Sequence, residues 1–497
     1  MQKTSKYFLI FDFGASNGRA SVASYDGNRF DFEVVHRFDN IPVYAGDTLY
    51  WDFLKLYSEL KSGLTAAVKK YGRIESLGID TWGVDFGLID KNGALISNPV
   101  HYRDKHRNSM PDEVYKLISA EEIFDLTGAA LVSYYGLFNL FSLKVRNASE
   151  YICADKLLMM PDLFNYFLTG IAVNEYTEAH TSMMVNPISM QWEKKLLEKL
   201  GLKTDIFNEI IQPGTILGDL QKSVCEELGI GPVSVVAPAS HDTPSAVAGI
   251  PIIDKNRNSL LMSTGTWNIT ILEMDKPLIN NKIFESGYAN EAGVEGKTLL
   301  FKNFVGMWLI QKSRDKWLKE SADNLSWDDI MYLAKDTPSS KSFIDVDAND
   351  FIVEVNDMPG AVKRFCKNTG QAVPGSIGEI ARVIYESMVC KVRQNLDTLE
   401  NLTGKKFDCI NMVGGGTKDV LLCQWLADAT GLTVYAGPTE TASVGNLIMQ
   451  LKAAGEIKNL DEGRQIAHKS AVVKEYVPGD KDYWDEAYNI FRSISGS

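Results

Sequence analysis

The feature that most constrains the fold is a strand, glycine turn, strand pattern that occurs twice, near the start of each half of the chain. In "FLIFDFGASNGRASVASY" (8–25), an apolar strand enters a glycine turn at 14–18 and a second strand follows. "NSLLMSTGTWNITILEM", which begins at residue 258, repeats the pattern. The segment "WDFLKLYSELKSGLTAAVKKYG" (51–72) has apolar residues at helical spacing and predicts an amphipathic helix that ends at Gly72. Because both halves begin with the same hairpin pattern, we expect a duplicated α/β core.

The chain is too long for one hydrophobic core. Its 497 residues are 45% hydrophobic and 23% charged, which is typical of a globular protein with two domains. In "GIPIIDKNRNS" (249–259), small, polar and proline residues precede a new apolar run, as at a domain boundary. We therefore predict domains at 1–248 and 249–497, with a mostly helical block over about 104–230.

The charge and the apolar pattern exclude several classes of protein. With a net charge of −13 and no long basic run, the chain lacks the Lys and Arg surface that binds nucleic acid. Its apolar runs are far shorter than the ~20 residues of a membrane span, and Met1 to Lys6 lacks the apolar core of a signal peptide. The six cysteines include no C-x-x-C pair, so neither a zinc site nor a disulfide framework is indicated. We expect a cytoplasmic protein with reduced thiols.

Asp12 is the unusual residue of the first hairpin, because it interrupts an apolar strand. The "GASNGR" turn lacks the lysine of a P-loop and leads into a strand, so a Walker-type site is not indicated. Its backbone N–H groups, with Ser16 and Arg19, can still bind the oxygens of a phosphate chain, and Asp12 can face the accompanying metal ion. The alternative is an ordinary hairpin with a solvent-facing aspartate. "STGTW" (263–267) offers a second turn of the same kind.

The segment "APASHDTPSAVAG" (237–249) places His241 and Asp242 among small, mostly apolar residues. An unpaired carboxylate is costly in such surroundings, so Asp242 is a candidate base for a substrate hydroxyl. The alternative is a helix N-cap, since Ser240, Asp242 and Thr243 all suit that position. The sequence leaves both interpretations open.

Three further motifs can be interpreted as binding sites or as structure. The glycines of "MVGGGTKD" allow a ligand to lie on the backbone or form a tight turn, and their spacing does not fit a dinucleotide site. In "DTWGVDF", Trp82 and its two acidic neighbours suit a sugar, although a core tryptophan is commoner. Gln311 shares a predicted helical face with Phe304, Met307 and Trp308, and is expected to contact either a ligand or the backbone.

Together, "DFGASNGR", "IDTWGVDF", "SHDT", "STGTW", "KNFVGMWLIQ" and "VGGGTKD" occur in order over residues 7–450. In this combination the chain resembles the FGGY carbohydrate kinases, most closely their rhamnulokinase branch. The resemblance implies an α/β fold of two actin-like (ribonuclease H-like) ATPase domains around a central cleft. It implies sugar and phosphate binding in 1–248 and nucleotide binding in 249–497, with ATP and Mg²⁺ as cofactors. The region beyond 350 is hard to align with the family signature, which leaves the C-terminal helices unassigned.

The resemblance also implies a role for each motif residue. Asp242 would be the catalytic base, and Asp12 would lie near the metal ion. The ketose would contact Gly83, His241, Asp242, Thr243 and Asn303. ATP would contact Ala15, Ser16, Asn17, Gly18, Arg19, Thr266, Gln311 and Gly415. One departure is the first loop, which reads Ala-Ser-Asn where many family members are rich in threonine.

The implied reaction is ATP-dependent phosphorylation of a 6-deoxy-ketohexose at O1, with L-rhamnulose as substrate and L-rhamnulose 1-phosphate as product. L-Fuculose differs only at C4, so an L-fuculokinase is the alternative. An actin-like nucleotide switch without sugar chemistry is a rival of another class, although it would not need the buried acid of "SHDT". The expected partners are ATP and a small ketose, without nucleic acid or membrane, in a monomer or homodimer.

Overall fold

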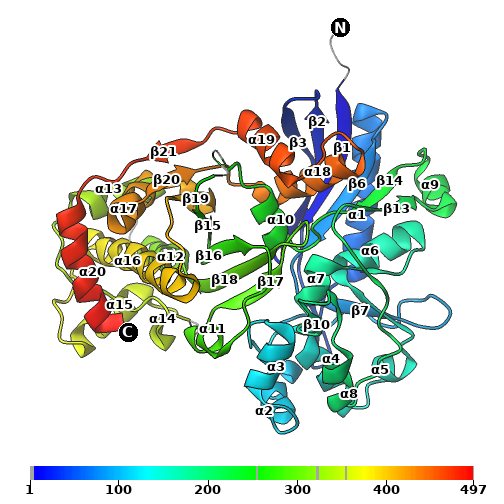
Figure 1. Cartoon of the computed structure of the whole chain (residues 1–497), viewed down its shortest axis with the longest axis horizontal. Helices are drawn as coiled ribbons and strands as arrows, with labels where there is room; N and C mark the ends of the chain where they lie inside the picture. Colours follow the sequence, from blue (N-terminus) through cyan, green and yellow to red (C-terminus); the bar gives the residue numbers. More distant parts are fainter. Residues whose placement is uncertain (1–4, 253, 255, 321–323, 353–354, 496–497) are drawn as a thin grey trace. The chain divides into compact units, whose positions relative to one another are not determined.

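The computed structural model describes residues 5–252, 254, 256–320, 324–352 and 355–495. It divides into two compact units, each built from three chain segments (Figure 1). Unit 1 comprises Met1–Pro251, Glu273–Leu300 and Thr441–Ser470. Unit 2 comprises Ile252–Leu272, Phe301–Glu440 and Ala471–Ser497. Each unit contains a β-sheet with helices, as the sequence predicted.

Unit 1 is built on a six-stranded sheet in the order β13-β14-β6-β1-β2-β3. Strands β1 and β2 form the predicted hairpin, and β3 extends it to an antiparallel meander, whereas β6 and β14 run parallel to β1. Because parallel strands end at the same edge of a sheet, the residues that follow β1, β6 and β14 gather there. The strands are β1 (Lys6–Phe13), β2 (Asn17–Tyr25), β3 (Phe30–Asp39), β6 (Ser76–Thr81), β13 (Thr215–Asp219) and β14 (Ser234–Ala237).

Alternate residues of β1 face opposite sides of this sheet. Leu9 and Phe11 pack in a core cluster with α1 (Phe53–Tyr71) and α6 (Met160–Thr169). Phe8 and Ile10 pack in another cluster with α18 (Thr441–Ala453), which Figure 1 shows in orange beside the blue strands. Helix α10 (Asp242–Ala248) contacts α18 and β6. Helix α1 lies within the predicted segment 51–72, with an Asp52 side-chain cap and Gly72 as its C-cap.

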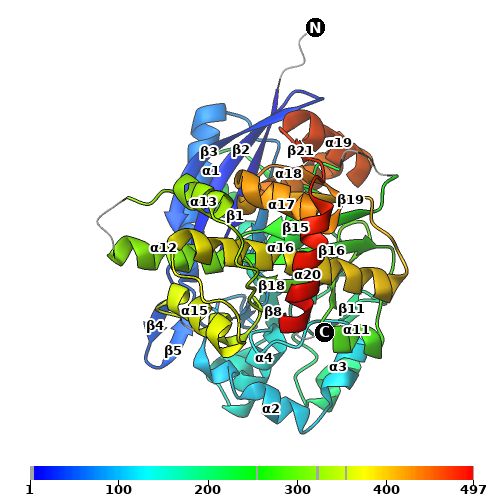
Figure 2. The ribbon, with the colours of Figure 1, turned by 90° about the vertical axis from the view of Figure 1, so that its left-hand side faces the viewer.

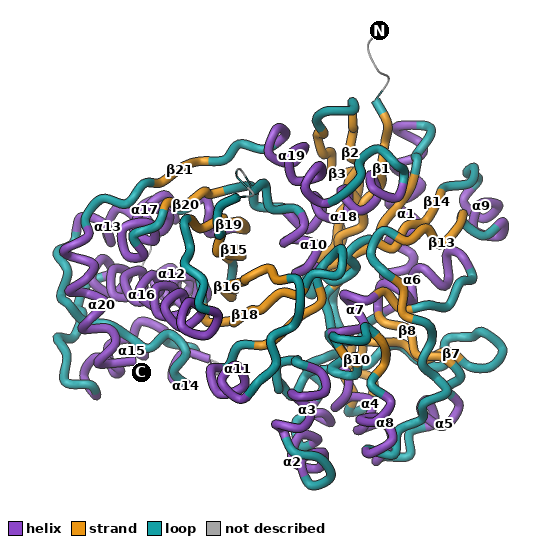
Figure 3. The backbone as a smooth tube through the Cα atoms, in the orientation of Figure 1, coloured by secondary structure: helices purple, strands orange, loops and turns teal. Residues whose placement is uncertain are grey.

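The helical block of unit 1 consists of short helices joined by loops (teal in Figure 3). The remaining helices of unit 1 are η1 (Lys105–Arg107), α2 (Met110–Tyr115), α3 (Ala120–Thr127), α4 (Gly136–Val145), α5 (Ser149–Cys153), α7 (Tyr176–His180), α8 (Lys194–Lys199), α9 (Lys222–Leu228), α11 (Asn281–Ser286) and α19 (Leu460–Ser470). Its two-stranded sheets pair β4 (Val43–Ala45) with β5 (Thr48–Tyr50), β7 (Phe86–Ile89) with β8 (Lys156–Met159), β9 (Asn174–Glu175) with β12 (Ile210–Ile211), and β10 (Val185–Asn186) with β11 (Gln191–Trp192).

The second large sheet has seven strands in the order β17-β18-β16-β15-β19-β20-β21. Strand β17 belongs to unit 1, and the other six strands belong wholly or partly to unit 2. The second predicted hairpin is confirmed, because β15 pairs antiparallel with β16 and parallel with β19. Strand β19 is followed by the 3-10 turn η2 (Gly415–Lys418), then by α17 (Val420–Thr430) and β20, so the triple glycine lies between a strand and a helix. The strands are β15 (Ser259–Thr264), β16 (Trp267–Met274), β17 (Ala289–Ala292), β18 (Thr298–Val305), β19 (Cys409–Gly414), β20 (Thr433–Ala436) and β21 (Lys474–Tyr476).

The helices of unit 2 centre on α16 (Ile377–Thr403), which contacts α13, α17 and α20 (Figure 2). The others are α12 (Trp308–Glu320), α13 (Trp327–Asp336), α14 (Asn349–Ile352), α15 (Met358–Asn368) and α20 (Lys481–Ser495). The predicted helical face of Gln311 is wrong at its start, because Phe304 belongs to β18 and α12 begins only at Trp308. Within the described ranges, no helix is long and apolar enough to cross a membrane.

Candidate active site

Asp12 ends β1 as a buried and paired carboxylate, 8% exposed. It lies opposite Arg19 in the β1–β2 register, and its Oδ2 is 2.6 Å from Arg19 Nη2. The hydroxyl of Ser443, from α18, also donates to Oδ2 at 3.4 Å. The alternative of a plain hairpin with a solvent-facing aspartate is therefore wrong. Asp12 is tolerated at the strand end because a cation and a hydroxyl compensate its burial.

The turn after Asp12 is fixed by Asn40, a residue that sequence reasoning missed. Asn40 donates its side-chain amide to the carbonyl of Gly14 at 2.9 Å and its backbone N–H to the carbonyl of Ser16 at 3.0 Å. Ser16 and Asn17 are exposed, Ala15 and Arg19 are partly exposed and Gly18 is buried. The five predicted phosphate-binding residues therefore share one braced turn. The only sequence signal for Asn40 was a polar residue directly after the third strand.

Asp80 is a second buried carboxyl at this edge of the sheet. It lies opposite Asp12 in the parallel β1–β6 register and is fully buried. One oxygen accepts a hydrogen bond from Asn446 Nδ2 at 2.7 Å, and the other has no partner among the described residues. Burial, followed by the charge of Asp12, raises the pKa of Asp80 well above its usual range. Asp80 is therefore a poor candidate for direct sugar contact.

Asp242 is the first residue of α10, and its carboxylate is accessible. His241 is the N-cap of this helix and makes no side-chain capping bond, so the helix-cap alternative for Asp242 is wrong. The Asp242 side chain is 40% exposed, and Thr243 donates its hydroxyl to Asp242 Oδ1 at 3.2 Å. Desolvation raises the pKa of Asp242, against the attraction of His241. A basic, accessible carboxylate of this kind can accept a proton from a substrate hydroxyl.

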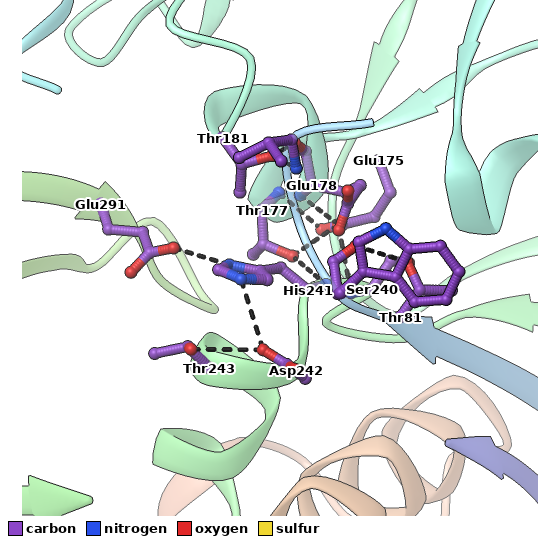
Figure 4. Close-up of polar contacts among 12 residues, drawn as sticks. Thr81, Glu175, Thr177, Glu178, Thr181, Ser240, His241, Asp242, Thr243 and Glu291 are labelled. Carbon is purple, nitrogen blue, oxygen red and sulfur yellow. Dashed lines mark hydrogen bonds and ion pairs between the residues drawn. The ribbon is translucent and has the colours of Figure 1, made fainter. Parts of the chain in front are cut away.

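His241 lies between two carboxylates, as Figure 4 shows. Its Nδ1 is 2.6 Å from Oε1 of Glu291, a residue of β17, and its Nε2 is 3.3 Å from Oδ1 of Asp242. Burial lowers the pKa of His241, but the charge and contact of Glu291, together with the charges of Asp242 and Glu175, raise the pKa overall. Glu291 was missed by sequence reasoning, because nothing in "YANEAG" marks it.

A buried pair, Glu175 and Thr177, holds the backbone of the loop that precedes Asp242 (Figure 4). Glu175 Oε2 accepts from the Thr177 hydroxyl at 2.6 Å and from the Ser240 N–H at 3.2 Å. The same hydroxyl accepts from the His241 N–H at 3.3 Å. On the other side, the Thr81 N–H donates to the carbonyl of Ser240 at 2.8 Å. The loop position is thus set by β6 and by the start of α7.

Gly83 lies against His241. A Cβ at this position would be 3.0 Å from His241 Nε2 and 2.9 Å from Thr181 Cγ2, so a side chain would displace one of them. The next residue, Val84, has a φ of 76° and donates its N–H to the Thr181 hydroxyl at 2.7 Å. A β-branched residue in this region is strained, and such strain gathers at functional sites. The structure therefore brings Gly83, His241, Asp242 and Thr243 together.

Trp82, in contrast, belongs to the core. It is 5% exposed, its ring centroid lies 3.9 Å from that of Trp51, and its Nε1 donates to Asp85 at 3.3 Å. Asp85 is fully buried and also accepts from Trp51 Nε1 and Arg107 Nη2, both at 2.6 Å. This network leaves no accessible face of Trp82 for a sugar. The commoner structural interpretation of this motif is confirmed.

In unit 2, the predicted nucleotide residues lie at the second hairpin and the triple glycine. The Thr266 hydroxyl donates to Gln311 Oε1 at 3.4 Å, and both residues are at least partly exposed. Gly414 and Gly416 lie so close to Thr264 that a Cβ would be 2.3 Å or 2.6 Å from its oxygens, whereas Gly415 faces open space. The hairpin and the glycine turn are therefore side by side. Asn303 lies on β18 with an exposed side chain.

A metal ion at this site would need oxygen ligands from the protein. The residues that the structure describes contain no group of three or more His, Cys, Asp or Glu that could hold a metal. Mg²⁺ differs from most metals, since it usually takes one or two carboxylates and otherwise binds water and substrate phosphates. A buried carboxylate at Asp12, beside the exposed "GASNGR" turn, fits that pattern.

The chain is similar to known proteins over nearly its whole length. The family models "FGGY family of carbohydrate kinases, N-terminal domain" and "C-terminal domain" match residues 7–249 and 260–454. A rhamnulokinase of Bacteroides thetaiotaomicron is 36% identical over 486 residues, covering 98% of this chain and 99% of its own. A rhamnulokinase of Oceanobacillus iheyensis is 36% identical, covering 93% and 96%.

Solved structures with a similar fold include a ligand-bound xylulose kinase and a gluconate kinase, both from Lactobacillus acidophilus. Their TM-scores are 0.81 and 0.82 at 17% identity, and the similarity covers 97% of each of them. The likeness covers 98% and 99% of this chain. It confirms the expected actin-like α/β fold with two sheet-bearing domains. On the family models and on relatives of nearly equal length, the chain belongs to the FGGY family of carbohydrate kinases.

Proposed function

We propose that this carbohydrate kinase transfers the γ-phosphoryl group of ATP to O1 of L-rhamnulose, giving ADP and L-rhamnulose 1-phosphate. The rhamnulokinase relatives support this substrate, because they match the chain over almost its whole length. The observation that carries the proposal is the accessible carboxylate of Asp242, held beside His241, Thr243 and Gly83 in a loop whose backbone is fixed from both sides.

In the proposed mechanism, Asp242 accepts the proton of the O1 hydroxyl as O1 attacks the γ-phosphorus and the bond to ADP breaks. Gly83, His241, Thr243 and Asn303 would contact the sugar. The absence of a side chain at Gly83 leaves the imidazole of His241 in place. Phosphoryl transfer needs little covalent chemistry from the protein, so positioning of O1 by these residues would supply most of the rate.

The nucleotide would be bound by Ala15, Ser16, Asn17, Gly18, Arg19, Thr266, Gln311 and Gly415. The exposed turn after β1 offers backbone N–H groups, and Thr266 and Gln311 offer paired side chains in unit 2. Asp12 would hold Mg²⁺, which when bound neutralises charge on the phosphates. The division into a sugar-binding part at 1–248 and a nucleotide-binding part at 249–497 stays a prediction. The oligomeric state, a monomer or homodimer, and the cytoplasmic location also stay predictions. The six free thiols suit a reducing compartment.

The substrate is tested by an ADP-release assay with ATP and Mg²⁺ over a panel that includes L-rhamnulose, L-fuculose, D-xylulose and glycerol. We expect the highest kcat/KM with L-rhamnulose, because a site built for one epimer leaves a buried polar group unpaired with the other. A higher kcat/KM with L-fuculose would assign the alternative activity. ATP hydrolysis that needs no sugar would instead favour a nucleotide switch.

The base is tested by Asp242→Asn, which keeps the shape of the side chain and removes its basicity. We expect turnover to fall by roughly 10²- to 10⁴-fold, while ATP binding, measured by calorimetry, stays nearly unchanged. Asp219→Asn, at an exposed position on β13, is the matched control and should keep normal turnover. Near-normal turnover of Asp242→Asn would remove this assignment.

A further inference from the structure

We propose that Glu291 is a positioning residue of the reaction, which keeps His241 cationic so that His241 in turn keeps Asp242 ionised as the proton acceptor. The inference rests on the function proposed above for Asp242. It adds a residue to the site, from β17, that no motif of the sequence contains.

The geometry is a chain of three groups that leads from the interior to the accessible carboxylate. Glu291 Oε1 is 2.6 Å from His241 Nδ1, and His241 Nε2 is 3.3 Å from Asp242 Oδ1 (Figure 4). The side chains are 9%, 14% and 40% exposed, respectively. Glu291 therefore lies behind the imidazole, and a sugar hydroxyl can reach Asp242 without displacing Glu291.

Asp242 needs a cation because the charges of Asp12 and Glu291 disfavour its ionised form. The titratable groups that face it, besides His241, are Asp12, Asp80, Glu178, Glu291 and Tyr102. Desolvation raises the pKa of Asp242, and the charges of Asp12 and Glu291 raise it further. The charge of His241 is the largest influence that lowers this pKa, and the hydrogen bond from Thr243 lowers it less. Without an imidazolium at 3.3 Å, Asp242 would hold its own proton over a wider pH range and could not accept one from the sugar.

The surroundings of His241 favour the cationic form. Burial opposes it, but Glu291, Asp242 and Glu175 all raise the pKa of His241, with Glu291 contributing most. The remaining neighbour is His180, and burial lowers its pKa to about 4. His180 is therefore neutral at physiological pH and does not repel a proton on His241.

Loss of the Glu291 charge has two opposite effects on Asp242. The direct repulsion disappears, which favours the ionised form of Asp242. The imidazolium also loses its partner and releases its proton, which disfavours that form. Coulomb energy falls with distance, and Glu291 acts from the far side of the ring, whereas Nε2 of His241 is only 3.3 Å away. The second effect is larger, so the pKa of Asp242 rises in a variant without this charge.

The test is Glu291→Gln, which keeps the size of the side chain and removes its charge. The acid limb of the pH profile of kcat/KM should move to higher pH by about 1–3 units, the usual effect of one close opposite charge. Activity should then approach that of the wild type at alkaline pH, with KM for the ketose unchanged there. Glu285→Gln, at an exposed position of α11, is the matched control and should keep the wild-type profile.

A second measurement does not depend on activity. The six histidines are labelled with ¹³C and titrated by NMR, and the His241 signal is assigned by its absence in His241→Gln. We expect His241 to titrate above the ordinary value of ~6.5 in the wild type and lower in Glu291→Gln. A neutral His241 at pH 7 in the wild type would overturn the inference, even if Glu291→Gln failed to fold. A raised KM with an unmoved acid limb would overturn it as well.

These results also separate the inference from the function on which it rests. If Asp242→Asn kept its turnover, the proposed base would be wrong, and the inference that depends on it would fall. If Asp242→Asn lost turnover while the pH profile of Glu291→Gln matched the wild type, only the role of Glu291 would be wrong.

Discussion

At the scale of residues, the buried carboxyls of unit 1 differ in what compensates their burial. Asp12 has the guanidinium of Arg19, whereas Glu178 is fully buried and has no hydrogen-bond partner for either oxygen among the described residues. Burial, followed by the charges of Asp162 and Glu175, raises the pKa of Glu178 well above its usual range. Burial therefore favours the protonated, neutral form of Glu178. A neutral acid behind the catalytic loop adds no negative charge next to Asp242.

Glu175 should make the stability of the protein depend on pH. Burial raises its pKa to about 7, although hydrogen bonds from Thr177 and from backbone N–H groups oppose the shift. Because the pKa of Glu175 is higher in the folded protein than its ordinary value, the proton on Glu175 stabilises the folded state. This stabilisation is complete below pH ~4.5 and is lost as pH rises through 7. The loss amounts to about 3 kcal/mol. The Glu175→Gln variant has no ionisable group here and therefore lacks this pH-dependent stabilisation. Its melting temperature should lie further below that of the wild type at pH 5 than at pH 8.

The exposed variant Glu285→Gln serves as the control for this comparison. Its melting temperature should follow the wild type at both pH values. An equal gap between Glu175→Gln and the wild type at pH 5 and pH 8 would mean that Glu175 ionises normally in the folded protein.

At the scale of elements, α18 holds the site of unit 1 together. Its residues Ser443, Asn446 and Gln450 lie at helical spacing on one face. They bond to Asp12, to Asp80, and to the carbonyl of Leu9, respectively. Helix α18 packs against α10 at Gly445. A Cβ on Gly445 would lie 1.8 Å from the backbone oxygen of Ser245 in α10, so only glycine fits there. Helix α18 therefore connects Asp12 with the helix that carries Asp242.

Gly445→Ala should test this contact. The new methyl group cannot be accommodated without moving α10, because the atom that it meets is backbone. We expect a loss of stability of ~1–3 kcal/mol or more, together with reduced turnover, since α10 begins at Asp242. Thermal melting and the ADP-release assay measure the two effects. Gly231→Ala, where a Cβ meets nothing within 4 Å, is the control and should match the wild type in both. Unchanged stability of Gly445→Ala would show that the helices can separate.

The elements also show what sequence patterns could and could not predict. Both glycine hairpins and α1 were correctly predicted, because each depends on local periodicity and turn residues. Helix α18 was left unassigned. Its residues are buried almost all round, so it has no amphipathic pattern, and its partners lie far away in sequence. Asp242 could be predicted because it lies in a local motif. Glu291 and Thr177 could not be predicted, because they contact the loop before Asp242 only in the folded chain.

At the scale of the whole molecule, the chain crosses repeatedly between the two units. Unit 1 takes Thr441–Ser470 from near the C-terminus, so its core is complete only after most of the chain has been made. Phe8 and Ile10 of β1 pack in a cluster with Leu447 and Ile448 of α18. The unit is thus not a contiguous domain, although a family model matches 7–249 as one.

This arrangement predicts that a fragment of residues 1–251 does not fold on its own. It lacks α18, so Phe8 and Ile10 lose the part of their apolar cluster that α18 supplies, and Asp80 loses Asn446, its hydrogen-bond donor. Each large apolar side chain returned to water costs about 1.5–3 kcal/mol, and a whole domain is stable by only about 5–15 kcal/mol. A few such losses together equal the whole stability of a domain.

We therefore expect the fragment to bind a hydrophobic dye and to melt without a cooperative transition, while the full chain melts cooperatively under the same conditions. Circular dichroism and dye fluorescence measure both properties. A cooperative transition of the fragment near the melting temperature of the full chain would mean that the α18 face contributes little to the core. Partial recovery of the transition on adding a peptide of residues 441–470 would instead assign the missing stability to that segment, because it supplies both the apolar face of α18 and the amide of Asn446.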